Sequence, residues 1–404
     1  MKPRRVLILV ENLPSPFDRR VWQEAGALRD AGCSVSIICP TGKGYESKFE
    51  SIDGIDIHRY HLPTEAEGAL GYALEYAAAL FWSFLLSLKV FFGRGFDVIH
   101  ACNPPDLFFL IGGFYKLFGK KFLFDHHDAN PELYEAKFGR RDLFYRLMLL
   151  VERLTFRTAD VSIATNQSYK RIAVERGGMD PSRVYVVRSG PSLERLKIVA
   201  PSPELKQGKK FLVGYVGVMG KQEGIDLLLQ SVHHVVFDLK RTDVHFALVG
   251  GGTSLEEMQA LAISMGVGDY VTFTGRVPDR DLLAVLNTAD VCVNPDVANT
   301  MNDISTMNKI MEYMALGKPI VQFDLTEGRF SAQKASLYAR KNDPADFAAK
   351  IVQLCDDPAL RREMGEYGRR RVIDELEWQH EAPKLLAAYE ALWTRPAHRP
   401  RTAT

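Results

Sequence analysis

Short, continuous apolar runs recur along the chain, each followed by a stretch with helical periodicity, and this pattern constrains the fold more than any other feature. In the first half the runs cover residues 5–10, 34–40, 56–60, 96–102, 121–127, 160–166 and 184–190. In the second half they cover residues 210–217, 244–252, 270–277, 291–295, 319–324 and 336–340. Continuous rather than alternating runs are typical of strands covered on both faces. The pattern therefore predicts an α/β chain whose sheets are parallel, with helices on each side.

The pattern restarts halfway along the chain, after a charged stretch that contains two prolines. A chain of 404 residues is long enough for two domains. We therefore predict two doubly wound, Rossmann-like domains in tandem, at residues 1–192 and 210–374, joined by a linker at 193–210. Residues 375–394 are expected to form a final helix or kinked helix pair. The basic, proline-containing tail at 395–404 is expected to be disordered.

Charge and cysteine usage exclude several classes of protein. The 51 basic and 50 acidic residues give a formal net charge of +1, so nothing favours nucleic acid as a partner. The five cysteines are scattered without a CxxC pair, so we expect neither a zinc site nor a disulfide framework. A reducing, cytoplasmic location fits best. The apolar run from Val6 to Val10 is too short for an export signal and is expected to be a strand.

One segment, residues 76–92, is apolar almost all round its helix. Its uninterrupted part, from Tyr76 to Leu88, is shorter than the roughly 20 residues that cross a bilayer. Two interpretations stay open. The segment is either a helix buried between a sheet and its neighbours, or a helix that presents part of its surface to a membrane. The second interpretation predicts peripheral contact with the inner face of the cell membrane.

Polar residues directly after strands are the candidate site, because ligands of doubly wound sheets bind beyond the carboxyl ends of the strands. Arg19 and Arg20 lie in the first turn of a helix, where the helix dipole disfavours cations. They either bind an anionic ligand or are simply solvated. His127 and Asp128 end a later strand, where a histidine beside acids can orient a hydroxyl or move a proton. A histidine hydrogen-bonded in a loop is the alternative for His127.

In the second half, glycines before a helix predict a phosphate site. Gly217 and Gly220 let backbone N–H groups approach a phosphate, and Lys221 adds a positive charge. A later helix, within residues 302–321, is expected to begin near Ser305. Its first backbone N–H groups would be unpaired and face the ligand.

The same later helix carries a carboxylate inside its apolar pattern. Glu312 and Asn308 are four residues apart and therefore neighbours on one face, with Lys309 beside them. A phosphate bound at the helix start, on the N–H groups of Ser305, Thr306 and Met307, together with a carboxylate that accepts from ribose hydroxyls, would make a nucleotide site.

Several of these motifs resemble the retaining glycosyltransferases of family 4. They are EYMALGKPIV, GYVG before a glycine-led helix, TADVCVNP, and PFDRRVWQEAGALRDAG, which is similar to a branch that makes bacterial surface polysaccharides. The resemblance covers roughly residues 5–390. It implies the GT-B fold, with a cleft between two Rossmann-like domains and a C-terminal helix that crosses back onto the first. It also implies a nucleoside diphosphate sugar as donor, a glycan or lipid-linked acceptor, retention of configuration, and neither metal nor cofactor.

The resemblance also implies roles for residues. Glu312 matches the family's ribose-binding glutamate, and His127 matches the histidine that contacts the sugar. The family's other glutamate falls at Ile304, and Asp303 is the nearest acid.

The family's diphosphate-binding Arg and Lys are also absent, because they fall at Val218 and Glu223. The basic residues that could replace them are Lys221, Lys309 and Arg276.

Together these arguments predict three sets of site residues. The catalytic set is His127, Asp303 and Lys221. The nucleotide-sugar set is Gly217, Gly220, Arg276, Ser305, Thr306, Met307, Asn308, Lys309 and Glu312. The acceptor set is Arg19, Arg20 and Asp128, and no metal ligand is predicted.

Other functions of the same fold remain as alternatives. A nucleotide-sugar epimerase would need no acceptor. A degenerate binding protein would keep Glu312 without turnover, which the absent acid at Ile304 favours. A dinucleotide-dependent oxidoreductase is disfavoured, because ENLPSP stands after the first strand in place of GxGxxG.

Overall fold

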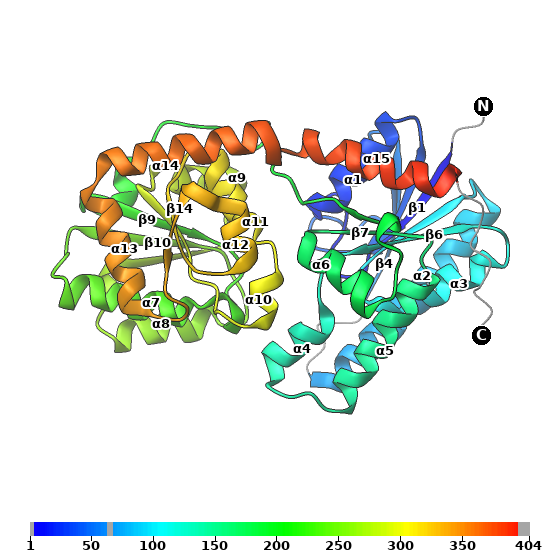
Figure 1. Cartoon of the computed structure of the whole chain (residues 1–404), viewed down its shortest axis with the longest axis horizontal. Helices are drawn as coiled ribbons and strands as arrows, with labels where there is room; N and C mark the ends of the chain where they lie inside the picture. Colours follow the sequence, from blue (N-terminus) through cyan, green and yellow to red (C-terminus); the bar gives the residue numbers. More distant parts are fainter. Residues whose placement is uncertain (1–3, 63–67, 395–404) are drawn as a thin grey trace. The chain divides into compact units, whose positions relative to one another are not determined.

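The computed structural model describes residues 4–62 and 68–394, which fold as two compact units. The first unit comprises the described residues of Met1–Glu135, Gly139–Ser189 and Glu381–Thr404. The second comprises Ala136–Phe138 and Gly190–His380. In each, helices cover a central sheet (Figure 1). The tail predicted at 395–404 lies outside the described residues.

The sheet of the first unit has eight strands in the order β3-β4-β2-β1-β5-β6-β7-β8. Their bounds are β1 Arg5–Leu9, β2 Ser34–Pro40, β3 Phe49–Ile52, β4 Ile55–Tyr60, β5 Val98–Cys102, β6 Lys121–His126, β7 Val161–Ala164 and β8 Val184–Val186. All neighbouring pairs are parallel except β3 with β4. Strand β3 was not predicted. It pairs across the turn Asp53–Gly54, where both residues have positive φ, as a two-residue hairpin turn requires.

The sheet of the second unit has six strands in the order β11-β10-β9-β12-β13-β14, all parallel. Their bounds are β9 Phe211–Val216, β10 Val244–Val249, β11 Val271–Gly275, β12 Val291–Asn294, β13 Ile320–Phe323 and β14 Ser336–Ala339. This order, in which the first strand lies in the middle, is that of a Rossmann fold. The predicted pair of doubly wound domains is confirmed.

The helices follow the strands as the apolar pattern predicts. Those of the first unit are α1 Arg19–Asp30, α2 Gly68–Phe92, α3 Phe109–Lys116, α4 Asn130–Phe138 as far as Glu135, α5 Leu143–Thr158, α6 Gln167–Arg171 and, from Glu381 onward, α15 Trp378–Thr394. Those of the second unit are α7 Ile225–His233, α8 Leu255–Ser264, α9 Asp279–Thr288, α10 Thr300–Ile304, α11 Asn308–Ala315, α12 Thr326–Ala332, α13 Pro344–Asp356 and α14 Pro358–Arg371.

The core of the second unit forms two layers, one on each face of the sheet. Alternate residues of β9 separate them, because Phe211 and Val213 pack with α7, α8 and α13, whereas Leu212 packs with α9 and α11. Leu196 belongs to the second of these layers. The stretch at 193–210, which the sequence predicted as a linker, is therefore part of the second unit.

Candidate active site

The strand order of the second sheet reverses between β9 and β12, and such a switch point is the usual ligand site of an open α/β sheet. After β9 the chain passes through Gly217 and Gly220 into a short 3-10 helix at Lys221–Glu223. After β12 it passes through α10 into α11. The predicted glycine loop and the predicted helix therefore flank the same switch point.

The side chain of Lys309 on α11 joins these two segments. Its Nζ donates to Glu223 Oε2 at 2.7 Å and to Asp296 Oδ1 at 2.9 Å. It also lies 4.9 Å from the centre of the Tyr215 ring. Burial alone would lower the pKa of Lys309, but Asp296, Tyr215 and Glu223 outweigh it and raise that pKa well above its ordinary value. Lys309 is therefore a permanently charged group inside the site.

The two carboxylates around Lys309 are not equivalent. Burial raises the pKa of Asp296 to about 7; Lys309 opposes this shift and Glu223 adds to it. Burial also disfavours the charged form of Glu223, but Lys309 outweighs it and lowers the pKa of that carboxyl. At neutral pH, Glu223 is thus the ionised partner of Lys309, whereas Asp296 exchanges a proton.

Gly217 is required by close packing against this cluster. A Cβ at this position would lie 2.5 Å from Tyr215 Oη and 3.3 Å from Lys309 Nζ. The Tyr215 hydroxyl is in turn within hydrogen-bond distance of Val218 O, at 3.1 Å. The loop after β9 therefore rests directly on the Lys309 cluster.

The helix start at Ser305 is a prediction that the structure corrects. Ser305 closes α10 and donates its N–H to Asn302 O at 3.3 Å, and α11 begins only at Asn308, with Met307 as its N-cap. The segment before α11 contains the short helix α10. Asn299 caps that helix, and Asn302 Nδ2 holds Gln222 O at 2.9 Å. The N-terminus of α11 thus lies about one turn later than the apolar pattern indicated, so the amide of Ser305 is already used.

Glu312 forms an ion pair with Arg195, a residue that the sequence analysis missed. Arg195 Nη1 also reaches Asp279 Oδ2 at 3.3 Å. The Glu312 side chain is half-buried, at 16% exposed. Nothing in the local sequence pointed to Arg195, because it lies in the stretch predicted as a linker and 117 residues from its partner.

The remaining predicted residues of the second unit are dispersed. Asp303 accepts from Thr326 Oγ1 at 2.7 Å and from Lys341 Nζ at 3.2 Å. Burial alone would raise the pKa of Asp303, but these hydrogen bonds outweigh it and lower that pKa. Its carboxylate is therefore committed to the start of α12. Lys221 and Arg276 are both exposed, and each follows the carboxyl end of a strand.

In the first unit a second cluster forms around Arg20 on α1. Its guanidinium donates to the two oxygens of Asp125 at 2.9 and 3.2 Å and pairs with Glu24 at 3.1 Å. It also donates to Val187 O at 2.9 Å, and its Nε lies 2.8 Å from His127 Nε2. Arg20 is buried, so its prediction as an acceptor-binding residue is corrected. Arg20 lies in the first turn of α1 because its anionic partner is Asp125 of the same protein and not a bound ligand.

The other predicted residues of this unit are more exposed than Arg20. Arg19 is exposed, and His127 and Asp128 follow β6 as predicted. Asn103 Oδ1 accepts from the backbone N–H groups of both, at 2.6 and 3.1 Å. The Nε2 of His127 contacts Asp125, whereas its Nδ1 makes no hydrogen bond with any described residue. His127 is thus held by one ring nitrogen and presents the other.

Four buried side chains of the first unit offer ligand atoms within 4.8 Å of one another: Glu24, His100, Cys102 and Asp125. A metal would need their ionised forms. Burial raises the pKa values of Glu24 and Cys102 well above their ordinary values, and Arg20 already neutralises Asp125. The set therefore fits a buried ion-pair network better than a metal site.

Solved structures of similar shape include sucrose-phosphate synthase from Thermosynechococcus elongatus, with a TM-score of 0.78 and 19% identity over 96% of this chain and 99% of that one. Another is WaaG, a glycosyltransferase involved in lipopolysaccharide biosynthesis, with a TM-score of 0.69 and 15% identity over 96% and 99%. At such identities the likeness shows the fold. The two Rossmann-like units therefore have the GT-B fold.

Two family models match this chain. "Glycosyltransferase Family 4" matches residues 18–195, and "Glycosyl transferases group 1" matches residues 210–357. The chain belongs to glycosyltransferase family 4.

Curated relatives share part of their length with this chain. The 2-deoxystreptamine glucosyltransferase of Streptomyces kanamyceticus is 28% identical over 59% of this chain and 60% of its own length. The D-inositol 3-phosphate glycosyltransferase of Geodermatophilus obscurus is 26% identical over 61% and 56%. The chain thus spans less than two thirds of these two relatives.

Proposed function

We propose that this protein is a retaining glycosyltransferase that moves a sugar from a nucleoside diphosphate sugar to a glycan or lipid-linked acceptor. The observation that carries the proposal is the glycine loop after β9 facing α11 across the switch point, with Lys309 joining them. N–H groups of such a loop and of a helix start suit a diphosphate. Glu312, one turn inside α11, suits the hydroxyls of a ribose.

The donor class has support from the similar structures. HepE from Anabaena has been solved in complex with UDP-glucose, and its chain gives a TM-score of 0.72 at 14% identity. Identity at this level carries the fold and not the site. The base and the sugar of the donor are identified by the panel of nucleoside diphosphate sugars below.

The proposed chemistry stabilises charge on the leaving diphosphate. Negative charge grows there as the bond to the sugar breaks, and preorganised N–H groups and cations lower the barrier. Lys309 holds the loop that supplies the N–H groups, while the exposed Lys221 and Arg276 add positive charge. As the acceptor oxygen bonds to the anomeric carbon, a leaving phosphate oxygen takes the proton of the acceptor hydroxyl. The N–H groups and cations neutralise the diphosphate in place of a metal, and no cofactor takes part. His127 contacts the sugar through Nδ1, and Asp303 takes no part in the reaction.

The proposed setting is the assembly of cell-surface polysaccharide in the cytoplasm, at the inner face of the membrane. Arg19 and Asp128, in the unit that carries His127, contribute to acceptor binding. Helix α2 provides peripheral contact with the membrane.

The test is a turnover assay with the full chain and a panel of nucleoside diphosphate sugars. We expect one donor to be consumed only when an acceptor is present, with the anomeric configuration of the donor kept in the product by NMR. Conversion of the donor into an isomer without acceptor would indicate an epimerase. Tight binding without consumption by any acceptor would indicate a binding protein.

A further inference from the structure

Helix α2 buries a stripe of mostly small side chains and leaves several of its large apolar side chains exposed. The buried stripe consists of Ala79, Ser83, Ser87 and Val90. These residues recur every three or four positions, and the helix packs on β2 and β4. The exposed apolar side chains are Leu74, Phe81, Trp82, Leu85 and Phe92, of which Phe92 is 81% exposed. A helix that belonged to the core would bury the second set and expose the first.

The same helix is long and apolar enough to cross a membrane by length and composition alone. Only 22% of the stretch Leu74–Phe92 is buried inside the protein. Because its buried stripe packs against the sheet, the helix lies along the unit and its exposed apolar side chains point outward. A contiguous apolar face that a folded unit leaves exposed marks a surface for a membrane or another apolar partner.

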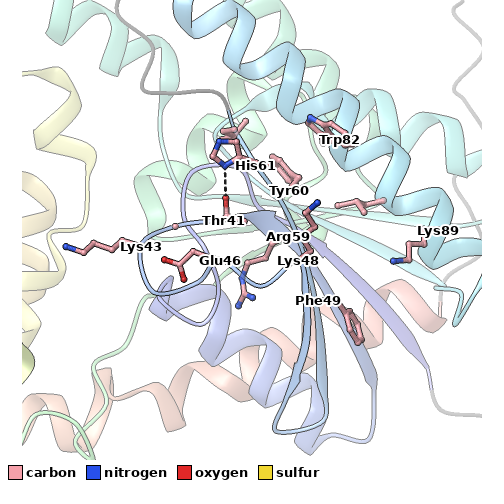
Figure 2. Close-up of a pocket in the computed structure, with 13 residues that line it drawn as sticks. Thr41, Lys43, Glu46, Lys48, Phe49, Arg59, Tyr60, His61, Trp82 and Lys89 are labelled. Carbon is pink, nitrogen blue, oxygen red and sulfur yellow. Dashed lines mark hydrogen bonds between the residues drawn. The ribbon is translucent and has the colours of Figure 1, made fainter.

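A cavity of about 740 Å³ adjoins this apolar face (Figure 2). From α2 it is lined by Trp82, Leu86 and Lys89. Its other lining side chains come from the carboxyl end of β4, from β3 and from the loop after β2, and include Lys43, Lys48 and Arg59. Figure 2 shows the lysines around the cavity, with Trp82 on the α2 side.

The charge of this cavity is positive and largely uncompensated. Lys43, Lys48 and Lys89 form no ion pair with any residue between 4 and 394 that the structure describes. The acid that lines the cavity, Glu46, accepts from Gly44 N at 2.8 Å. Arg59 is fully buried and pairs with Glu50, but its Nε has no hydrogen-bond partner among the described residues. The three lysines of the cavity are thus not neutralised by an acidic side chain among the described residues.

We propose that this cavity binds the phosphate-bearing head of a membrane lipid whose tail lies along the exposed apolar face of α2. The three lysines supply donors for a phosphate, and the adjoining apolar side chains supply the surface that an alkyl or polyprenyl chain covers. Trp82 lies where the two meet, and tryptophan is enriched at membrane–water interfaces. The inference rests on the proposed membrane contact of α2 and adds to it a specific site for the headgroup.

The first test measures co-sedimentation of the full chain with vesicles of phosphatidylcholine, with and without phosphatidylglycerol. The variant Lys43→Gln/Lys48→Gln/Lys89→Gln should bind the anionic vesicles roughly 100-fold more weakly than the unmodified chain. The matched control Lys240→Gln/Lys334→Gln/Lys350→Gln removes the same charge from the second unit and should bind normally. Equal loss in both variants, or no loss in the first, would overturn the proposal.

The second test separates a lipid from a free phosphate. Bromine-labelled acyl chains should quench the fluorescence of Trp82, and Trp82→Phe should lose most of that quenching. Glycerol 3-phosphate alone should bind far more weakly than vesicles. If it bound as tightly, or if quenching survived Trp82→Phe, the tail would not lie on α2.

Calorimetry with the nucleoside diphosphate sugar distinguishes failure of this inference from failure of the proposed function. The cavity lysines lie in the first unit and the proposed donor site in the second, so the triple lysine variant should keep donor affinity. Loss of donor and lipid binding together would show a general defect and would overturn the assignment of a headgroup site.

Discussion

Arg20 in the first unit and Lys309 in the second each lie between two acidic side chains near the carboxyl ends of parallel strands. Arg20 has Asp125 and Glu24 as partners, and the donors of its guanidinium are taken up by these and by other protein atoms. Lys309 has two carboxylates as well, but one of them, Asp296, has a pKa raised to about 7 by burial. All partners of Arg20 are protein atoms at fixed positions, whereas the Lys309 cluster can change its charge when Asp296 gains or loses a proton.

The difference separates a structural role from a binding role. The Arg20 cluster fixes β6, and with it the histidine that follows the strand. The Lys309 cluster lies against Gly217, so a change in its charge alters the electrostatic potential at the loop that we assign to the diphosphate. When an anion binds there, Asp296 can take up a proton and lower the negative charge nearby. The predictions below begin with the largest effect expected and end with the smallest.

The largest effect is expected for Arg20→Met. It leaves Asp125 as an uncompensated buried carboxylate, so the free energy of unfolding of the first unit should fall by about 3–5 kcal/mol. Urea denaturation followed by circular dichroism measures this loss, with the two units allowed to unfold separately. The neighbouring exposed Arg19→Met should cost less than about 1 kcal/mol. Similar losses in both variants would show that the Arg20 cluster is not the structural centre of its unit.

A smaller loss, of about 2–3 kcal/mol, is expected for Lys309→Met, because Glu223 loses a charged hydrogen-bond partner but keeps some contact with water. Donor binding should weaken as well. The double variant Lys309→Met/Glu223→Gln should recover part of the stability, because it no longer buries a lone charge. Strictly additive losses in this cycle would contradict direct coupling of the pair.

Asp296→Asn should change how stability depends on pH. Burial raises the pKa of Asp296 to about 7 in the folded state, above its unfolded value, so this group costs stability as pH rises. The cost begins near pH 4 and is complete slightly above pH 7, at about 1.4 kcal/mol per pH unit. The variant lacks it, so its stability relative to the unmodified protein should increase over that window. Parallel pH profiles for the two proteins would show that Asp296 does not titrate there.

The smallest effects are expected for Lys221→Gln and Arg276→Gln. Both side chains are exposed, so each should weaken donor affinity by about 0.5–1 kcal/mol, and less at high salt. Calorimetry at two salt concentrations measures this, with Lys240→Gln as a control of equal charge. A loss that is independent of salt would indicate a direct, desolvated contact instead.

The architecture could be predicted because strands covered on both faces leave continuous apolar runs, and all strands except β3 were found in this way. Strand β3 was missed although the Asp53–Gly54 turn signalled a hairpin, because its side chains are partly exposed at the edge of the sheet. The start of α11 was placed too early, because an apolar pattern reports the buried face of a helix and does not show where a preceding short helix ends.

The site was harder to predict than the fold, because its partners are distant in sequence. Glu312 was identified from its place in a helix, but Arg195 lies 117 positions away from it. The cation at Arg20 was noticed, yet the carboxylate that explains it lies 105 positions away. Lys309 was one of three basic candidates for the diphosphate. Only the fold shows that it contacts Glu223, which stands in place of a family lysine, together with Asp296.

Calorimetric titration of the full chain and of Glu312→Gln with the panel of nucleoside diphosphate sugars tests the central claim, that the second unit binds the donor at its switch point. The account predicts that the donor bound by the unmodified chain binds the variant roughly 10- to 100-fold more weakly, from the loss of a charged acceptor. Asp279→Asn, which removes only the other partner of Arg195, should change that affinity less than about twofold. Equal affinity of the Glu312 variant and the unmodified chain would contradict the account.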